Sequence, residues 1–429
     1  MTYGLIGEHL PHSFSKDIHA KCALYEYELC EIPPDGLDAF MKAADFRAIN
    51  VTIPYKQAVM PYLCYVHENA QRIGAVNTVV NRSGRLYGYN TDFYGLTALI
   101  RHMGLDVSDK KVLILGTGGT SHTARAVVTS LGAGTVVTVS RRTSDDGDTV
   151  DYETAYAAHN DADVIINTTP CGMYPCADGT PTRSATPIDI TRFPRLSGVV
   201  DAVYNPLRTN LVQDAVEAGI PAEGGLYMLV AQAVVASHVF LGDDITLAGT
   251  DPMVYAAIDK IYEEILSEKE NIVLIGMPGS GKSTVGQALS ALMGRPFLDT
   301  DALIVQAEGK SIAEIFDEVG EAGFREIESR VVRETAATHT GCVIATGGGA
   351  ILRDDNVRAL RRTGRLYFLD RALEELLPTA DRPLASTADA IRRRFEERYD
   401  RYIAVCDRRI VIDENIEHTV AAIREDFTV

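Results

Sequence analysis

The stretch that decides the fold of the second half is NIVLIGMPGSGKST, residues 271–284. An apolar run ends at Ile275, and the pattern G-x-x-x-x-G-K-S/T follows it. In such a loop, backbone N–H groups converge on phosphates at the start of a helix, while the lysine reaches the phosphates and the hydroxyl ligates Mg²⁺. The alternative is a glycine-rich turn without a ligand, but the strand before it and the helix pattern after it favour phosphate binding. The residues expected at the nucleotide are Gly276, Gly279, Ser280, Gly281, Lys282, Ser283 and Thr284.

Apolar, β-branched runs alternate with helical patterns along the rest of the chain. The runs are 111–115, 135–139, 163–167 and 198–201 in the first half and 271–275, 342–345 and 365–369 in the second. Continuous apolar strands that alternate with helices are typical of parallel sheets covered on both faces. We therefore expect an α/β fold with parallel sheets in both halves. A helix starting at Pro252 separates the two series, and the polar segment 267–270 that follows it is predicted to be a linker.

Composition excludes several classes of partner. The chain has 429 residues, enough for two or three domains, and a formal net charge of −18. Because a field of this sign repels phosphate backbones and anionic membrane surfaces, we expect neither nucleic acid nor a membrane as a partner. No signal-peptide pattern opens the sequence, and the seven cysteines form no C-x-x-C pair. We expect a cytoplasmic protein, a monomer or homodimer, that acts on small molecules.

Polar motifs follow the phosphate-binding loop in a fixed order. They are Asp299-Thr300-Asp301, the helical pair Arg325 and Glu328, the run Gly347-Gly348-Gly349, Asp381-Arg382-Pro383-Leu384 and Glu397-Arg398-Tyr399. A carboxylate at a strand end can accept the proton of an attacking hydroxyl, and arginines can fork onto a substrate carboxylate. Each motif alone has a plainer interpretation, as a helix cap, an exposed ion pair or a solvated helix face. Their joint occurrence favours a functional site.

This ordered set resembles shikimate kinase over essentially all of residues 271–429. The resemblance implies that Asp301 binds the substrate hydroxyl and acts with Lys282 in catalysis of transfer from ATP. It implies that Ser283 and Asp299 belong to the Mg²⁺ site. The residues it assigns to the substrate are Asp301, Arg325, Gly347, Gly348, Gly349 and Arg398, and Arg382 is assigned to a lid over the ATP phosphates.

The first half contains its own nucleotide-binding pattern, KVLILGTGGTSHTA at residues 111–124. A strand, a G-x-G turn and a helix in succession suit a dinucleotide. The next strand ends in Ser140-Arg141-Arg142 rather than in an acidic residue. Arginine there accommodates the 2′-phosphate of NADP, although two arginines on a solvated loop remain the alternative. The residues expected at NADP(H) are Gly116, Gly118, Gly119, Thr120, Ser140, Arg141, Arg142 and Thr168.

Further polar clusters lie at 12–15, 50–56, 74–78, 88–92 and 225–232. Taken in order, they look like shikimate dehydrogenase across residues 1–266, a two-domain family whose last helices return to the substrate domain. The resemblance makes Lys56 and Asp92 the catalytic pair, and a lysine paired with an aspartate can transfer protons in both directions of a ketone reduction. The residues it assigns to the substrate are Ser13, Ser15, Thr52, Asn77 and Gln232.

The two resemblances together predict a bifunctional enzyme of aromatic amino acid biosynthesis. It would reduce 3-dehydroshikimate to shikimate with NADPH and then phosphorylate shikimate to shikimate 3-phosphate, on the route to chorismate. The predicted domains are a substrate-binding domain (1–100, completed by about 225–266), a Rossmann-type NADP domain (101–224), the linker 267–270 and a kinase domain (271–429). The alternatives are a catabolic quinate/shikimate dehydrogenase fused to another small-molecule kinase, and a sensor or scaffold that binds without turnover.

Overall fold

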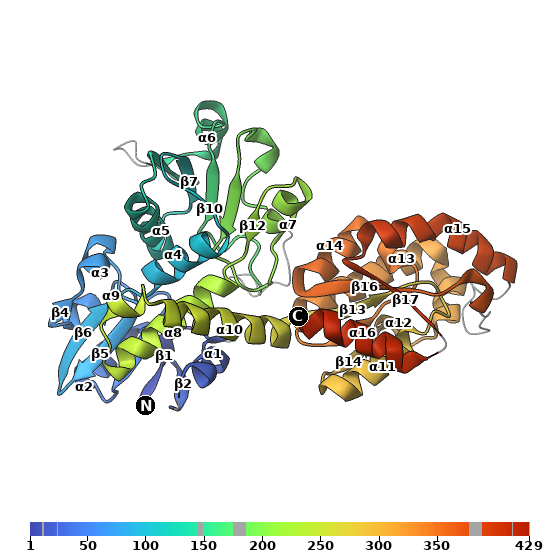
Figure 1. The fold of residues 1–429 in the computed structure, drawn as a ribbon, viewed down its shortest axis with the longest axis horizontal. Helices are drawn as coiled ribbons and strands as arrows, with labels where there is room; N and C mark the ends of the chain where they lie inside the picture. The colour runs from blue at the N-terminus through green and yellow to red at the C-terminus, as the bar shows by residue number, and fades with distance from the viewer. Residues whose placement is uncertain are drawn as a thin grey trace. The chain divides into compact units, whose positions relative to one another are not determined.

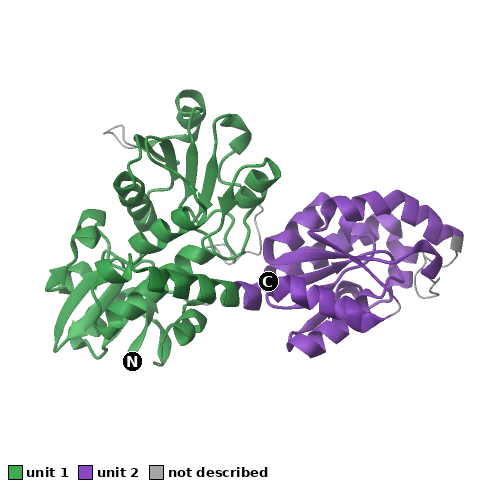
Figure 2. Cartoon of the chain, in the orientation of Figure 1, with its two compact units in different colours: residues 1–177, 183–265 green, residues 178–182, 266–429 purple. Residues whose placement is uncertain are grey.

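The computed structural model describes residues 1–10, 13–23, 25–143, 149–174, 186–376, 388–413 and 415–428 (Figure 1). The described residues form two compact units, and the boundary between them falls between Ile265 and Leu266 (Figure 2). Both units contain a parallel sheet with helices, so the predicted α/β class is confirmed. Within the described ranges, no helix combines the length and the apolar character that a bilayer crossing requires.

The first unit begins with a mixed sheet in the order β2-β1-β3-β5-β6-β4. Its strands are β1 (Tyr3–Gly7), β2 (Tyr27–Glu31), β3 (Ala48–Val51), β4 (Tyr65–Val66), β5 (Thr78–Arg82) and β6 (Arg85–Tyr89). The accompanying helices are α1 (Ser15–Cys22), α2 (Leu37–Ala43), α3 (Glu68–Ile73) and α4 (Asp92–His102). The late helix α8 (Leu226–Leu241) packs against α1, α4 and strands β3 and β5, so the chain returns to this sheet (Figure 1). The boundary predicted near residue 100 falls within α4.

The second sheet of this unit is parallel throughout, in the order β12-β11-β10-β7-β8-β9. Its strands are β7 (Lys111–Leu115), β8 (Thr135–Val139), β9 (Thr149–Val150), β10 (Val164–Asn167), β11 (Gly198–Asp201) and β12 (Ala222–Glu223). Its helices are α5 (Gly119–Ser130), α6 (Tyr152–Ala158) and α7 (Asn210–Glu217). If β7 to β12 are numbered 1 to 6 along the chain, their order across the sheet is 3-2-1-4-5-6. The chain builds the sheet outward in one direction from β7 and in the other direction from β10, so the switch point lies between these two strands. Ligands bind at this point in doubly wound sheets.

The second unit has a five-stranded parallel sheet in the order β14-β15-β13-β16-β17. Its strands are β13 (Asn271–Ile275), β14 (Phe297–Asp299), β15 (Val343–Ala345), β16 (Gly364–Asp370) and β17 (Arg408–Val411). Its helices are α11 (Lys282–Met293), α12 (Thr300–Glu308), α13 (Ile312–Thr338), α14 (Asp354–Thr363), α15 (Ala388–Val405) and α16 (Ile416–Thr428). Strand β13 is buried on both faces: Val273 packs with Tyr402 of α15, and Leu274 packs with Leu289 of α11. This double burial explains why the strand is an unbroken apolar run.

Helix α10 (Pro252–Lys269) corrects the predicted linker 267–270. The helix continues through Lys269, and β13 starts two residues later at Asn271. The backbone carbonyls at the end of a helix lack partners within it, and Arg295 supplies donors here. Its guanidinium donates to the carbonyl oxygen of Ser267 and, over 2.7 Å, to that of Glu270. The side chain of Glu270 is 1% exposed and forms an ion pair with Arg365. The polar segment is therefore packed into the second unit.

Replacing Arg295 by alanine should destabilise the second unit by about 2–4 kcal/mol, because two charge-assisted hydrogen bonds to backbone carbonyls are lost. The measurement is native-state hydrogen exchange of the β13 amides. The matched control is Arg353→Ala, which removes an ion pair with the exposed Glu326 and should leave the stability of the unit almost unchanged. Equal protection of β13 in the two variants would contradict this account of the end of α10.

Candidate active sites

The predicted catalytic pair of the first unit is in contact. Lys56 lies in the turn after β3 and Asp92 opens α4, and Lys56 Nζ lies 2.6 Å from Asp92 Oδ2. The two side chains are 19% and 11% exposed, so the pair is largely shielded yet open to a ligand. The Lys56 backbone is held by the N–H of Val76, which donates to its carbonyl over 2.8 Å. This arrangement can hold a proton at a fixed place beside a bound hydroxyl or ketone.

Two of the predicted substrate residues, Asn77 and Gln232, are connected through Thr91. The Asn77 side chain accepts from the Thr91 N–H over 2.7 Å and donates to the Thr91 hydroxyl over 3.0 Å. That hydroxyl lies 3.3 Å from Gln232 Oε1 on α8. Segments far apart in the sequence therefore meet beside the catalytic pair. Thr91 was not predicted as a site residue, although it stands in a polar cluster that the sequence analysis singled out.

Asn50 on β3 is hydrogen-bonded to the Asn77 backbone, and it was not predicted as a site residue either. Its side-chain nitrogen donates to the Thr78 hydroxyl (3.1 Å) and to the Asn77 carbonyl (3.3 Å), and its oxygen accepts from the Tyr27 hydroxyl (2.7 Å). All four residues are buried. The sequence signal for Asn50 was a polar residue inside an otherwise apolar strand. Its hydrogen-bond partners could not be predicted, because they are distant in the sequence.

The remaining predicted substrate residues lie at the start of α1 and directly after β3. Ser15 begins α1, and its N–H donates to the Ser13 hydroxyl over 3.2 Å. The Thr52 N–H donates to the carbonyl of Ile6, and a Cβ on Gly7 would lie only 2.7 Å from the Thr52 methyl group. Glycine at this position therefore leaves room for Thr52. The described hydrogen bonds connect the two serines to each other and not to Lys56.

The predicted dinucleotide turn lies at the switch between β7 and β10. Gly116 has φ +107°, and a Cβ there would lie 3.0 Å from the Thr168 hydroxyl, so both conformation and space favour glycine. That hydroxyl donates to the Leu115 carbonyl over 2.6 Å and ties the end of β10 to the end of β7. Gly118 is the N-cap of α5, and Gly119 and Thr120 form its first turn. Backbone N–H groups at such a helix start can bind a diphosphate.

The residues predicted to select NADP follow the adjacent strand β8. The Arg142 N–H lies 3.4 Å from the Ser140 hydroxyl, and both Arg141 and Arg142 are exposed. Since β7 and β8 are parallel neighbours, these cations lie at the same edge of the sheet as the Gly116 turn. Their position suits an anionic group on the ribose of a bound dinucleotide.

The buried carboxylate of Asp201 stabilises this edge of the sheet, and Asp201 was not predicted as a site residue. Asp201, at the end of β11, accepts hydrogen bonds from Asn167 Nδ2 (2.9 Å), the Thr209 hydroxyl (2.6 Å) and the Val203 N–H (3.0 Å). Burial raises the pKa of Asp201 to about 6. Asn167 in turn accepts from the Thr169 N–H and hydroxyl. Asp201 therefore positions the turn that carries Thr168.

The phosphate-binding loop of the second unit has the expected conformation. Gly279 and Gly281 have φ +81° and +88°, which favour glycine, and Gly281 is the N-cap of α11. Ser280 is fully buried within the loop, and Thr284 lies in the first turn of α11. The loop therefore presents backbone N–H groups at a helix N-terminus, as phosphate binding requires.

Lys282 is held close to the loop by backbone contacts. Its Nζ donates to the carbonyl oxygens of Gly276 and Met277, each over 2.9 Å, and the side chain is buried. A lysine tethered in this way is a pre-positioned cation that a phosphate can recruit. Arg382, predicted for the lid, lies outside the described residues.

The two predicted metal ligands are adjacent. The Ser283 hydroxyl donates to Asp299 Oδ2 over 2.7 Å. Asp299 also caps α12 by accepting from the Asp301 N–H over 3.0 Å. Hydroxyl and carboxylate oxygens are ligands that Mg²⁺ prefers, and Mg²⁺ commonly uses few protein ligands beside nucleotide phosphates. The donor set therefore fits that ion.

The glycine run after β15 packs against the predicted substrate residues. A Cβ on Gly347 would lie 2.6 Å from Asp301 Oδ1 and 2.8 Å from Glu328 Oε1. The Gly347 N–H donates to the Thr300 hydroxyl over 2.9 Å. Gly347 therefore allows two carboxylates to approach the backbone, where any side chain would push them away.

Both predicted carboxylate-binding arginines converge on the same run. Arg398 donates to the Gly348 carbonyl over 3.1 Å, and a Cβ on Gly349 would collide with the Arg325 guanidinium. Arg325 donates to Glu328 over 2.7 Å. Burial raises the pKa of Glu328 and lowers the pKa of Arg398. Two arginines facing one backbone segment form a site for an anionic group.

Tyr402 joins the two loops of this unit and was not predicted as a site residue. Its buried hydroxyl lies 2.9 Å from the Gly276 carbonyl and 2.6 Å from the Gly348 carbonyl. Its ring stacks on Phe368 of β16, with centroids 4.9 Å apart. The phosphate-binding loop and the glycine run are therefore both held by the Tyr402 side chain.

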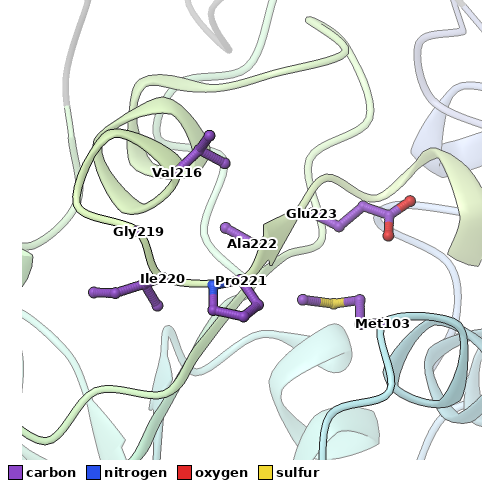
Figure 3. Close-up of a pocket in the computed structure, with 7 residues that line it drawn as sticks. All are labelled: Met103, Val216, Gly219, Ile220, Pro221, Ala222 and Glu223. Carbon is purple, nitrogen blue, oxygen red and sulfur yellow. The ribbon is translucent and has the colours of Figure 1, made fainter.

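An open cavity of about 490 Å³ lies elsewhere in the first unit, at the edge strand β12 (Figure 3). It is lined by Met103, Val216, Gly219, Ile220, Pro221, Ala222 and Glu223. None of these is a predicted site residue, and Glu223 accepts from the Tyr262 hydroxyl over 3.0 Å. The cavity is mostly apolar and is separate from the catalytic groups described above.

The geometry defines a dinucleotide-dependent dehydrogenase unit followed by a phosphate-loop kinase unit. Comparison with known proteins agrees with both. The shikimate dehydrogenase substrate binding domain family matches residues 5–79, and the shikimate kinase family matches residues 278–427. The chain belongs to the shikimate dehydrogenase family and carries a shikimate kinase domain after it, which confirms the resemblances and makes it a bifunctional enzyme of the shikimate pathway.

Individual relatives cover the first unit. Shikimate dehydrogenase (NADP(+)) of Clostridium beijerinckii is 35% identical over 256 residues, which are 56% of this chain and 91% of the relative. Shikimate dehydrogenase 1 of Peptoclostridium difficile has a solved structure that is 32% identical, with a TM-score of 0.54, over 62% of this chain and 98% of that one. A chorismate mutase/shikimate 5-dehydrogenase fusion protein from Clostridium acetobutylicum is also 32% identical, with a TM-score of 0.54, over 62% and 96%.

Proposed function

We propose that the first unit reduces 3-dehydroshikimate to shikimate with NADPH, and that the second unit transfers the γ-phosphoryl group of ATP to the 3-hydroxyl of shikimate. The observation that carries the proposal is the presence of both families on one chain, because the product of the first reaction is the substrate of the second. The intact Lys56–Asp92 contact and phosphate-binding loop support turnover rather than a sensor or scaffold role.

In the dehydrogenase reaction, NADPH supplies the hydride when it is bound. Lys56 donates a proton to the ketone oxygen as negative charge develops there, and Asp92 holds the ammonium group in place and stabilises it. In the reverse direction the same amine accepts the proton. Asn77 and Gln232, braced through Thr91, orient the ring together with Ser13, Ser15 and Thr52. Lys56 and Asp92 act as the catalytic residues.

In the kinase reaction, ATP supplies the phosphoryl group and Mg²⁺ would be held by Ser283 and Asp299. Asp301 accepts the proton of the attacking hydroxyl, at a position fixed against Gly347. Arg325 and Arg398 bind the substrate carboxylate. Lys282 neutralises charge on the transferred group.

Substrate competition tests this proposal against its rival. The full chain should reduce 3-dehydroshikimate in preference to 3-dehydroquinate and should phosphorylate shikimate in preference to gluconate or a nucleoside monophosphate. Preferred use of quinate-type substrates or of another acceptor would support the catabolic fusion instead. Binding of either substrate without turnover would identify a sensor or scaffold.

The double replacement of Arg141 and Arg142 by alanine should lower the preference for NADPH over NADH about ten-fold or more, because charge-assisted contacts to the 2′-phosphate are lost. The measurement is kcat/KM for the two cofactors. Arg195→Ala, which changes an exposed arginine in the turn before β11, is the control and should leave the ratio unchanged. An unchanged ratio in the double variant would remove these arginines from cofactor selection.

A further inference from the structure

Arg371 lies beside the phosphate-binding loop but outside the loop motif itself. It follows β16 directly, and β16 pairs in parallel with β13, in a register that sets Phe368 opposite Ile275. Since β13 runs into the loop, the end of β16 lies next to it. Arg371 Nη2 lies 4.0 Å from the position that a Cβ on Gly281 would occupy. The guanidinium therefore flanks the N-cap of α11.

The contacts of Arg371 leave donors available. Its Nη1 lies 3.4 Å from Glu375 Oε2, a long contact to a carboxylate whose side chain is 46% exposed. Its Nε is buried and has no hydrogen-bond partner among the described residues. An arginine carries five N–H donors in a planar fork that matches phosphate geometry. Leaving a buried donor unpaired costs free energy, so a ligand that pairs with it is favoured.

We infer that Arg371 is a further nucleotide-binding residue of the kinase site, which contacts the phosphates from the side of β16. This place already favours anions, because the N-terminus of α11 directs backbone N–H groups toward it. Binding replaces the long contact with Glu375 by charge-assisted bonds to phosphate oxygens. The inference rests on the proposed kinase activity of the second unit. It adds to that activity a second cation beside the loop that Lys282 contacts.

The competing interpretation is a purely structural ion pair between Arg371 and Glu375. The two roles make different predictions for the partner. If the pair is structural, Arg371→Ala and Glu375→Ala should have similar effects. If Arg371 binds phosphates, Glu375→Ala should leave nucleotide binding unchanged or tighten it, because a competing carboxylate is removed.

Calorimetric titration of the full chain with Mg-ADP tests the inference, with inorganic triphosphate as a competitor that lacks base and ribose. Arg371→Ala should weaken binding of both about ten- to hundred-fold, and raise the KM for ATP while the KM for shikimate is unchanged. The control is Arg408→Ala, at the start of the neighbouring edge strand β17, where the arginine forms an ion pair with Asp426 of α16.

The outcomes separate the inference from the function on which it rests. Unchanged triphosphate affinity in Arg371→Ala, or an equal loss of affinity in Glu375→Ala, would overturn the inference alone. A wild-type chain that binds no Mg-ADP would overturn the proposed kinase activity and the inference with it.

Discussion

Replacing Lys56 by alanine is expected to lower kcat for reduction of 3-dehydroshikimate by about 10²–10⁴-fold, with a smaller effect on substrate binding. The reason is that Lys56 Nζ, 2.6 Å from Asp92 Oδ2, is the group placed to protonate the developing alkoxide. Its contribution belongs to the transition state, so kcat should fall more than KM rises. Steady-state oxidation of NADPH measures both parameters.

The chain provides a matched control in the same domain. Lys42 and Asp38 form a comparable contact, 2.8 Å long, but their side chains are 68% and 57% exposed on α2. Lys42→Ala should leave kcat within about two-fold of the wild-type value, because exposed ion pairs contribute little. A Lys56→Ala variant with wild-type kcat would remove Lys56 from the mechanism.

Replacing Lys282 by alanine is expected to lower kinase turnover by at least about 10²–10³-fold, because the cation that neutralises the transferred phosphoryl group is lost. Asp301→Asn, which keeps the shape of the side chain but not its basicity, should also abolish detectable phosphorylation of shikimate. Dehydrogenase activity of the same preparations should remain near the wild-type value, since the Lys56–Asp92 site lies in the other compact unit. Formation of ADP in the presence of shikimate measures the effect.

Lys310→Ala is the control for the kinase variants. Lys310 forms an ion pair with Glu318, and both side chains are about half exposed. Its loss should leave phosphorylation almost unchanged. Kinase turnover of Lys282→Ala close to that of Lys310→Ala would contradict the assigned role of the loop lysine.

The fold was largely predictable because its signals are local. The runs 111–115, 135–139 and 271–275 are strands with those bounds, since strands buried on both faces are apolar at every position. The buried stripe Val254, Ile258, Ile261 and Ile265 of α10 was likewise visible from its spacing. The first sheet was less predictable, because its edge strand β4 has two residues and little pattern of its own.

The errors and omissions arise from partners that are distant in the sequence. The end of α10 resembles a linker because it is polar, and the partners that hold it are distant in the sequence, among them Arg295, 28 residues beyond Ser267. Asp201 and Tyr402 likewise act through contacts that no local pattern encodes. Residues within a motif could be assigned to a site, whereas the residues that brace the motifs required the structure.

The most direct test of the central claim is a single incubation of the purified chain with 3-dehydroshikimate, NADPH and Mg-ATP, followed by mass spectrometry. The expected product is shikimate 3-phosphate, with equal amounts of NADPH oxidised and ATP consumed. Without ATP, shikimate should accumulate, and without NADPH, neither product should form. Oxidation of NADPH without any phosphorylated product, or phosphorylation of an added acceptor other than shikimate in preference to it, would contradict the account.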